Sequence, residues 1–85
     1  MKSFNYVITD EIGIHARPAG MLVKKAKEFA STITLEANGK KADLTKLMML
    51  LSIGVKKGTE VTITAEGADE DAAITAMEAA FQENL

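Results

Sequence analysis

The chain has 85 residues, of which 47% are hydrophobic, and a formal net charge of −2. This length suits one domain with a single core, over residues 1–85. The absence of cysteine excludes disulfides and thiol chemistry. No N-terminal apolar run resembles a signal peptide, and the longest apolar block, residues 47–51, is far too short to span a bilayer. We therefore expect a soluble cytoplasmic protein without direct membrane insertion.

The charges are unevenly distributed along the chain. Residues 15–57 carry nine basic and three acidic side chains, a net charge of +6, whereas the remainder carries one basic and nine acidic side chains, a net charge of −8. This segment is either ordinary solvated surface or a positive face that attracts acidic partner proteins. Nucleic acid is not an expected partner, because the chain is acidic overall and no basic run is interleaved with aromatic residues.

The first third of the chain predicts a strand, a loop and a helix. Alternation predicts a half-buried strand, with the apolar residues Phe4, Tyr6 and Ile8. A loop over residues 10–13 follows. Apolar residues then recur at helical spacing: Ala19, Leu22, Val23, Ala26 and Phe29. They predict a helix from near Ala16 to Glu28.

The middle of the chain predicts a β-hairpin. Apolar and polar residues alternate over 32–36, which indicates a second strand. Asn38-Gly39 is a strong two-residue turn signal because both residues tolerate a positive φ. A short return strand is therefore expected over residues 40–43.

The block over residues 45–52 is apolar enough for a buried strand but rich in Leu and Met, which favour helix. We interpret it as a short helix. Either Asp43 or Thr45 would cap its start, and Gly54 would end it.

The last part of the chain predicts a strand and a long helix. Alternation over residues 61–65 indicates the strand, and Asp69 is the expected cap of the helix. Its buried stripe comprises Ala73, Ile74, Met77, Ala80 and Phe81. The order β-α-β-β-α-β-α predicts an α+β open-faced sandwich, in which helices cover one side of an antiparallel sheet. Several α+β folds share this order.

The most informative stretch is the predicted helix start, where His15, the only histidine, lies two residues before Arg17, the only arginine. Pro18 falls in the first turn, where a missing N–H costs nothing. A helix N-terminus attracts anions through free N–H groups and a partial positive charge, and a guanidinium binds phosphate oxygens with two donors. The alternative is a solvated surface histidine or a weak N-cap. The combination favours a histidine that carries a phosphoryl group.

Several segments spread along nearly the whole chain share a further property. They are Gly13-Ile14-His15-Ala16-Arg17-Pro18-Ala19, Asn38-Gly39-Lys40-Lys41, Leu47-Met48, Ser52-Ile53-Gly54-Val55, Gly58-Thr59-Glu60-Val61 and Ala65-Glu66-Gly67 with Asp69-Glu70. Together, in this order, they resemble one family, the histidine-containing phosphocarrier (HPr) family of the bacterial phosphoenolpyruvate-dependent sugar phosphotransferase system. The resemblance selects the HPr fold, with a four-stranded antiparallel sheet and three helices on one face.

The resemblance implies that His15 accepts a phosphoryl group from phospho-enzyme I and passes it to IIA domains of sugar permeases. Arg17 and the helix start formed by Ala16, Arg17 and Pro18 would hold the phosphoryl charge. The family uses the Nδ1 nitrogen of the histidine, whereas the sequence does not indicate which ring nitrogen acts here. No metal or other cofactor is expected, and we expect a monomer.

The resemblance also implies a docking surface beside the histidine. Leu47, Met48 and Leu51 match the family's exposed apolar patch, and their spacing places them on one helix face. The alternative is core packing, which we expect for Leu50 and Ile53. Lys24 and Lys27 would add a basic rim, although an ordinary solvated face explains them almost equally well.

Position 46 departs from the family. Many members have a serine there that a regulatory kinase phosphorylates, whereas this chain has Lys46. Regulation through that serine is therefore not expected. Two alternatives to sugar uptake stay open: a carrier in a nitrogen-type regulatory branch, and a regulatory paralogue that only binds. A protein that only binds has no need of the nucleophile that His15 provides.

Overall fold

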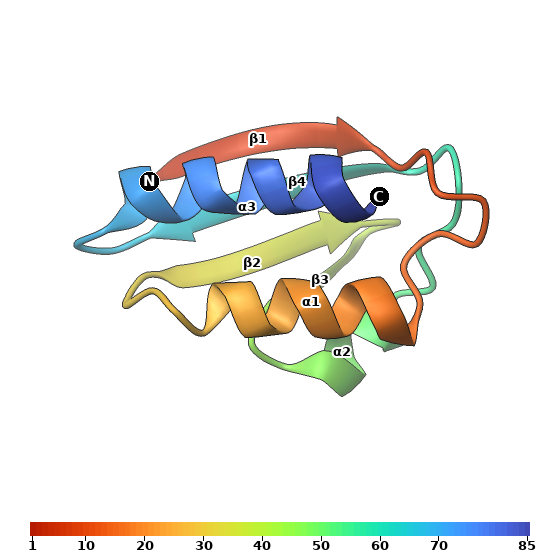
Figure 1. Ribbon diagram of the computed structural model, residues 1–85, viewed down its shortest axis with the longest axis horizontal. Coiled ribbons are helices and arrows are strands. Elements are labelled where there is room, and N and C mark those ends of the chain that lie inside the picture. Colours follow the sequence, from red (N-terminus) through yellow and green to blue (C-terminus); the bar gives the residue numbers. More distant parts are fainter.

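Figure 1 shows a computed structural model that describes residues 1–85, in which four strands form one sheet and three helices pack beside it. The element order is the predicted β-α-β-β-α-β-α. In sequence order the elements are β1 (Lys2–Val7), α1 (Ala16–Ala26), β2 (Thr32–Ala37), β3 (Lys40–Asp43), α2 (Leu47–Ser52), β4 (Glu60–Glu66) and α3 (Glu70–Asn84). Helix α1 ends two residues earlier than predicted, and the chain then turns toward β2.

The sheet has the strand order β1-β4-β2-β3, and every neighbouring pair is antiparallel. Ile63 in β4 lies opposite Phe4 in β1 on one side and Leu35 in β2 on the other. Alternation places these apolar side chains on the same face. The helices bury this apolar face of the sheet.

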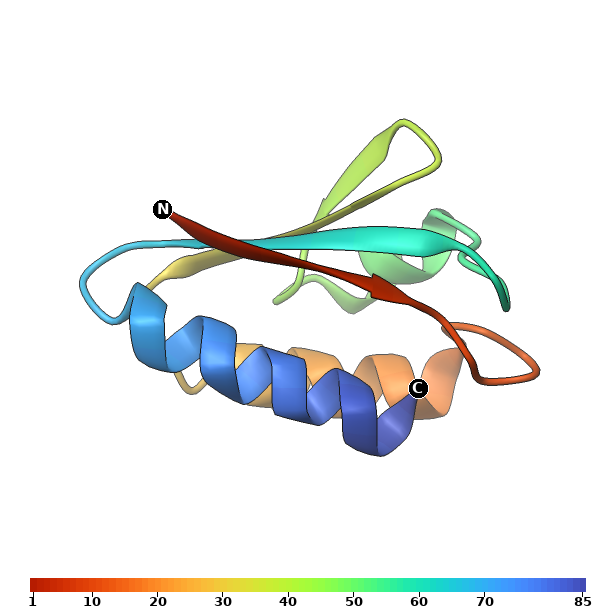
Figure 2. The same ribbon diagram turned by 90° about the horizontal axis from the view of Figure 1, so that it is seen from above.

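Helices α1 and α3 lie side by side against one face of the sheet, as Figure 2 shows, and the short α2 joins this layer by packing against α1 and β3. Twenty-two buried apolar residues form one core cluster between the layers. Phe81 of α3 is fully buried, and its ring lies edge-on to Phe4 at 5.8 Å and to Tyr6 at 5.6 Å. The predicted α+β open-faced sandwich is confirmed. None of the helices is both long enough and apolar enough to cross a membrane.

The expectation that Asp69 caps the last helix is wrong in one respect. Asp69 occupies the N-cap position of α3, but its side chain makes no capping hydrogen bond. Its carboxylate instead accepts hydrogen bonds from the backbone N–H groups of Ala30 and Ser31, both at 2.9 Å, and from the Ser31 hydroxyl. The Ser31 hydroxyl, followed by the Ala30 N–H, lowers the pKa of Asp69 below its usual range. Asp69 therefore ties α3 to the segment between α1 and β2.

The cap of α2 also differs from the prediction. The N-cap residue is Lys46, without a side-chain capping bond. Asp43 accepts hydrogen bonds from the hydroxyl of Thr45 at 2.6 Å and from its backbone N–H at 2.8 Å, and these bonds lower the pKa of Asp43. The two predicted caps therefore bind one another and close the turn that leads into α2.

Candidate functional site

The loop between β1 and α1 is held in a fixed shape. Oδ1 of Asp10 accepts hydrogen bonds from the backbone N–H of Ile12 at 2.9 Å and of Gly13 at 3.2 Å. Gly13 has φ +86, and a Cβ atom there would lie 2.3 Å from the carbonyl oxygen of Val55. The N–H of Ile14 donates to that same oxygen at 3.0 Å. Only glycine fits this close approach. The contact with Val55 fixes the position of the backbone at the residue that follows Ile14.

That residue is His15, which is the N-cap of α1. Its backbone is extended, with φ −123 and ψ −175, and its carbonyl accepts the first helical hydrogen bond, from Ala19 at 2.9 Å. The imidazole makes no capping hydrogen bond and is 35% exposed. The backbone therefore starts the helix while the side chain stays available to a ligand.

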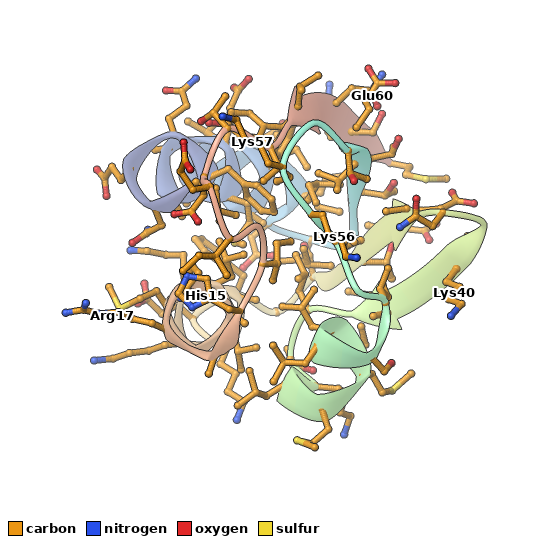
Figure 3. All side chains as sticks on the ribbon, turned by 90° about the vertical axis from the view of Figure 1, so that its right-hand side faces the viewer. His15, Arg17, Lys40, Lys56, Lys57 and Glu60 are labelled. Atoms are coloured by element: carbon orange, nitrogen blue, oxygen red, sulfur yellow. The ribbon has the colours of Figure 1, made fainter.

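The groups around the imidazole come from several elements. A hollow of about 490 Å³ is lined by Asp10, His15, Arg17, Pro18, Met21 and Asn84. Figure 3 looks onto this end of the molecule and shows Arg17 close to His15, with its side chain directed outward. Nε2 of His15 lies 3.9 Å from Oδ1 of Asp10.

The start of α1 has the features of an anion site. The N–H groups of Ala16 and Arg17 have no backbone acceptor, and no acidic residue lies in the first turn. Pro18, which is buried, has no N–H to satisfy. The structure therefore brings together the predicted residues Ala16, Arg17 and Pro18 beside His15. An imidazole nucleophile next to a helix N-terminus and a guanidinium is suited to phosphoryl chemistry. No group of three or more His, Cys, Asp or Glu residues is placed to hold a metal ion.

The chain is similar to known proteins over most of its length. A family profile described as the PTS HPr component phosphorylation site matches residues 2–83. The chain belongs to the HPr family. It is 47% identical over 77 residues to phosphocarrier protein HPr of Mycoplasma capricolum. The aligned residues cover 91% of this chain and 86% of that protein.

Solved HPr structures have the same fold. A histidine-containing phosphocarrier protein from Mycoplasma aligns with a TM-score of 0.94 and 43% identity, over 96% of this chain and 93% of that one. An HPr dimer from Thermoanaerobacter tengcongensis aligns with a TM-score of 0.78 and 37% identity, over 98% of this chain and 95% of that one. Phosphocarrier identity follows from this membership.

The predicted docking residues differ in exposure. Met48 is 77% exposed, whereas Leu47 and Leu51 are half-buried and pack partly against the core. Leu50 and Ile53 are buried, as expected. The exposed apolar surface of α2 is therefore provided mainly by Met48 and by Met49, which is 49% exposed, with the edges of Leu47 and Leu51.

The predicted basic rim lies on the outside of α1, where Lys24 and Lys27 are exposed. Neither has a carboxylate within 4.0 Å, whereas Lys25 and Lys57 form ion pairs with nearby glutamates. Figure 3 shows Lys56, on the segment before β4, at the same end as His15. Arg17 and Lys56 therefore lie at the same end of the molecule as the imidazole, whereas Lys27 is the C-cap of α1 and lies at the opposite end of that helix from His15.

Three residues of the hollow are not found by sequence reasoning. Asp10 is recognisable in the sequence only as a loop carboxylate, and Met21 only as a residue outside the buried stripe of α1. Met21 is 53% exposed. Asn84 comes from the end of α3, and its amide donates to the carbonyl of Ala80 at 2.8 Å. No local pattern links Asn84 to His15, because the packing of α3 beside α1 brings them together.

Proposed function

We propose that residues 1–85, acting as one domain, carry a phosphoryl group on His15 between enzyme I and IIA domains of sugar permeases. The observation that carries this proposal is the free imidazole at the N-cap of α1, beside Arg17, in a chain of the HPr family. The chain has no other histidine. A relay of this kind would operate in the cytoplasm, where both partners would meet it.

The chemistry needs a neutral ring nitrogen with a free lone pair. That lone pair attacks phosphorus while the P–N bond to the donor's imidazole breaks, and the donor ring keeps the bonding electrons. Arg17 and the N–H groups of Ala16 and Arg17 then hold the phosphoryl oxygens through charge-assisted hydrogen bonds. These contacts lie at a partly exposed surface, so they hold the group without preventing the reverse attack by the next acceptor.

Docking follows from the surface around the site. Partners would contact the apolar surface formed by Leu47, Met48 and Leu51, while Lys24 and Lys27 attract acidic groups at its edge. A Met-containing surface adapts to several unrelated partners. This adaptability suits a carrier that must bind its donor and its acceptors with the same face.

A nitrogen-type regulatory branch would use the same His15 chemistry with other acceptors. We favour sugar uptake because the relatives reported above are phosphocarriers of the HPr type. A protein that only binds is disfavoured by the free imidazole and its anion site. We also propose that the chain acts as a monomer. The dimer solved for a relative makes size-exclusion chromatography the direct test.

The relay is tested by incubation with phosphoenolpyruvate, enzyme I and a panel of IIA domains. We expect one acid-labile, base-stable phosphate per chain, which passes to sugar-type IIA domains when these are added. Transfer only to a nitrogen-type IIA domain would favour the second candidate. No incorporation at all would contradict the proposal.

A further inference from the structure

One carboxylate faces the imidazole from the preceding loop. Oδ1 of Asp10 lies 3.9 Å from Nε2 of His15, and both side chains are about one-third exposed, at 30% and 35%. Glu11, the next residue, is directed elsewhere, since its carboxylate pairs with Lys57 at 3.4 Å. Asp10 is therefore the acidic side chain that lies next to the reactive ring.

Asp10 is held in this position. The oxygen that faces Nε2 is the same Oδ1 that accepts the backbone N–H groups of Ile12 and Gly13. The close approach of Gly13 to Val55 fixes that backbone in turn. The carboxylate cannot swing toward solvent without breaking two hydrogen bonds, so its negative charge stays beside one particular nitrogen.

A fixed carboxylate next to Nε2 selects the form of the ring. In a neutral imidazole one nitrogen carries the proton and the other the lone pair, and the neighbour of one nitrogen sets which form prevails. A carboxylate favours a proton on the nitrogen it faces. Nε2 then holds the proton, and the lone pair lies on Nδ1, away from Asp10.

We infer that Asp10 is a positioning residue that keeps His15 in the Nε2–H form and thereby directs phosphoryl transfer to Nδ1. The inference rests on the proposed function of His15. When Nδ1 forms its bond to phosphorus and the donor's P–N bond breaks, His15 keeps the Nε2 proton and the ring becomes cationic. Asp10 faces that developing positive charge, while Arg17 faces the phosphoryl oxygens.

Asp10→Asn and Asp10→Ser test this role. An asparagine or serine oxygen still accepts backbone N–H groups in a turn of this kind, so both variants retain the loop but lose the charge. Glu11→Gln is the matched control, since it removes one negative charge from the same loop without facing His15. Two quantities are measured: the tautomer ratio from 15N NMR of the imidazole, at a pH where the ring is neutral, and the initial rate of phosphate acceptance from phospho-enzyme I.

We expect both Asp10 variants to lose the predominance of the Nε2–H form and to accept phosphate roughly two- to fivefold more slowly at unchanged melting temperature, as for loss of a half-exposed charge contact. Glu11→Gln should match the wild type in both measurements. Wild-type behaviour of both Asp10 variants in either measurement, or equal slowing in Glu11→Gln, would overturn the inference. The NMR measurement needs no partner, so it reports on Asp10 even if His15 proves not to be phosphorylated.

Discussion

The two long helices of this protein begin in similar ways but use their first residue differently. A glycine with a positive φ precedes each start and lies against another segment: Gly13 against Val55 before α1, and Gly67 against Ser31 before α3. Neither N-cap side chain, His15 or Asp69, makes a capping hydrogen bond. The two ends share these features, although ψ of the N-cap residue is −175 at His15 and 30 at Asp69.

The side chains distinguish the two helix starts. The Asp69 carboxylate accepts three hydrogen bonds from Ala30 and Ser31, and Glu70 and Asp71 supply negative charge to the first turn of α3. The imidazole of His15 makes no capping hydrogen bond, and the first turn of α1 has no acidic residue. The N-cap side chain of α3 is engaged within the fold and its first turn carries negative charge, whereas the N-cap side chain of α1 makes no capping hydrogen bond and its first turn has no carboxylate. This difference is the structural basis of the proposed site.

Alanine at each glycine would separate a loss of stability from a loss of function. Gly13→Ala places a Cβ 2.3 Å from the carbonyl of Val55, and Gly67→Ala places one 2.7 Å from Cα of Ser31. Since the obstacle is backbone in both cases, each should lower the free energy of unfolding in urea by about 3 kcal/mol. Only Gly13→Ala should also slow phosphate acceptance at a temperature where the variant is folded. Equal slowing in Gly67→Ala would break the comparison.

Met48→Asp should weaken partner binding by about 2 kcal/mol, because it places a charge in the centre of an apolar interface. Met48 is 77% exposed, so the melting temperature should change little. Titration calorimetry with enzyme I and with a IIA domain measures the affinities. Met77→Asp is the contrasting variant, since that residue is fully buried and its substitution should unfold the protein. Unfolding of Met48→Asp would show that this side chain belongs to the core.

Arg17→Ala should slow phosphate acceptance on the order of tenfold, the effect of losing one charge-assisted contact to a phosphoryl group. Arg17 is exposed and forms no ion pair, so stability should be unaffected. Lys41→Ala is the control, since it removes a cation from β3 that does not line the hollow, and it should leave the rate near the wild type. A wild-type rate for Arg17→Ala would remove the arginine from the site.

Asp69→Asn should reduce stability in a pH-dependent manner and leave phosphate acceptance intact. The pKa of Asp69 is lower in the folded protein than in the unfolded chain, so its carboxylate stabilises the fold above the unfolded pKa, and this contribution is lost as the pH falls through the folded pKa. The melting temperature of the variant should lie about 5 °C below the wild type at pH 7, and the gap should narrow below about pH 4.

Asp71→Asn serves as the control for Asp69→Asn, since its carboxylate is 82% exposed and pairs only with Lys2 at 3.5 Å. Its melting temperature should stay near the wild type across the same pH range. A gap for Asp69→Asn that does not change between pH 7 and pH 3 would contradict the assigned role of the carboxylate.

The element order and the helix start at residue 16 follow from the sequence because both depend on local spacing. The periodicity of α1 and the alternation in β2 and β4 are read within a few residues of the chain. The roles of Asp69 and Asp43 were predicted wrongly because a cap position specifies where a residue lies, not which N–H groups its side chain meets. The partners of Asp69 are 38 and 39 residues away in the chain.

The residues of the candidate site also differ in whether local sequence indicates them. His15, Arg17 and Pro18 adjoin in sequence and were found from that adjacency. Asp10 and Asn84 enter the hollow only through a fixed loop and through helix packing, which no local pattern encodes. Sequence reasoning therefore finds the proposed nucleophile and its proposed anion site more readily than the residue proposed to orient that nucleophile.

The most direct test of the comparison is to replace the N-cap residue of each long helix and to measure how much phosphate the variant accepts. His15→Ala and Asp69→Ala are incubated with phosphoenolpyruvate and enzyme I, and acid-labile phosphate per chain is measured alongside the melting temperature. We predict no phosphate and a nearly unchanged melting temperature for His15→Ala, and about one phosphate per chain with a melting temperature lowered by several degrees for Asp69→Ala. Phosphate retained by His15→Ala, or lost from folded Asp69→Ala, would contradict the account.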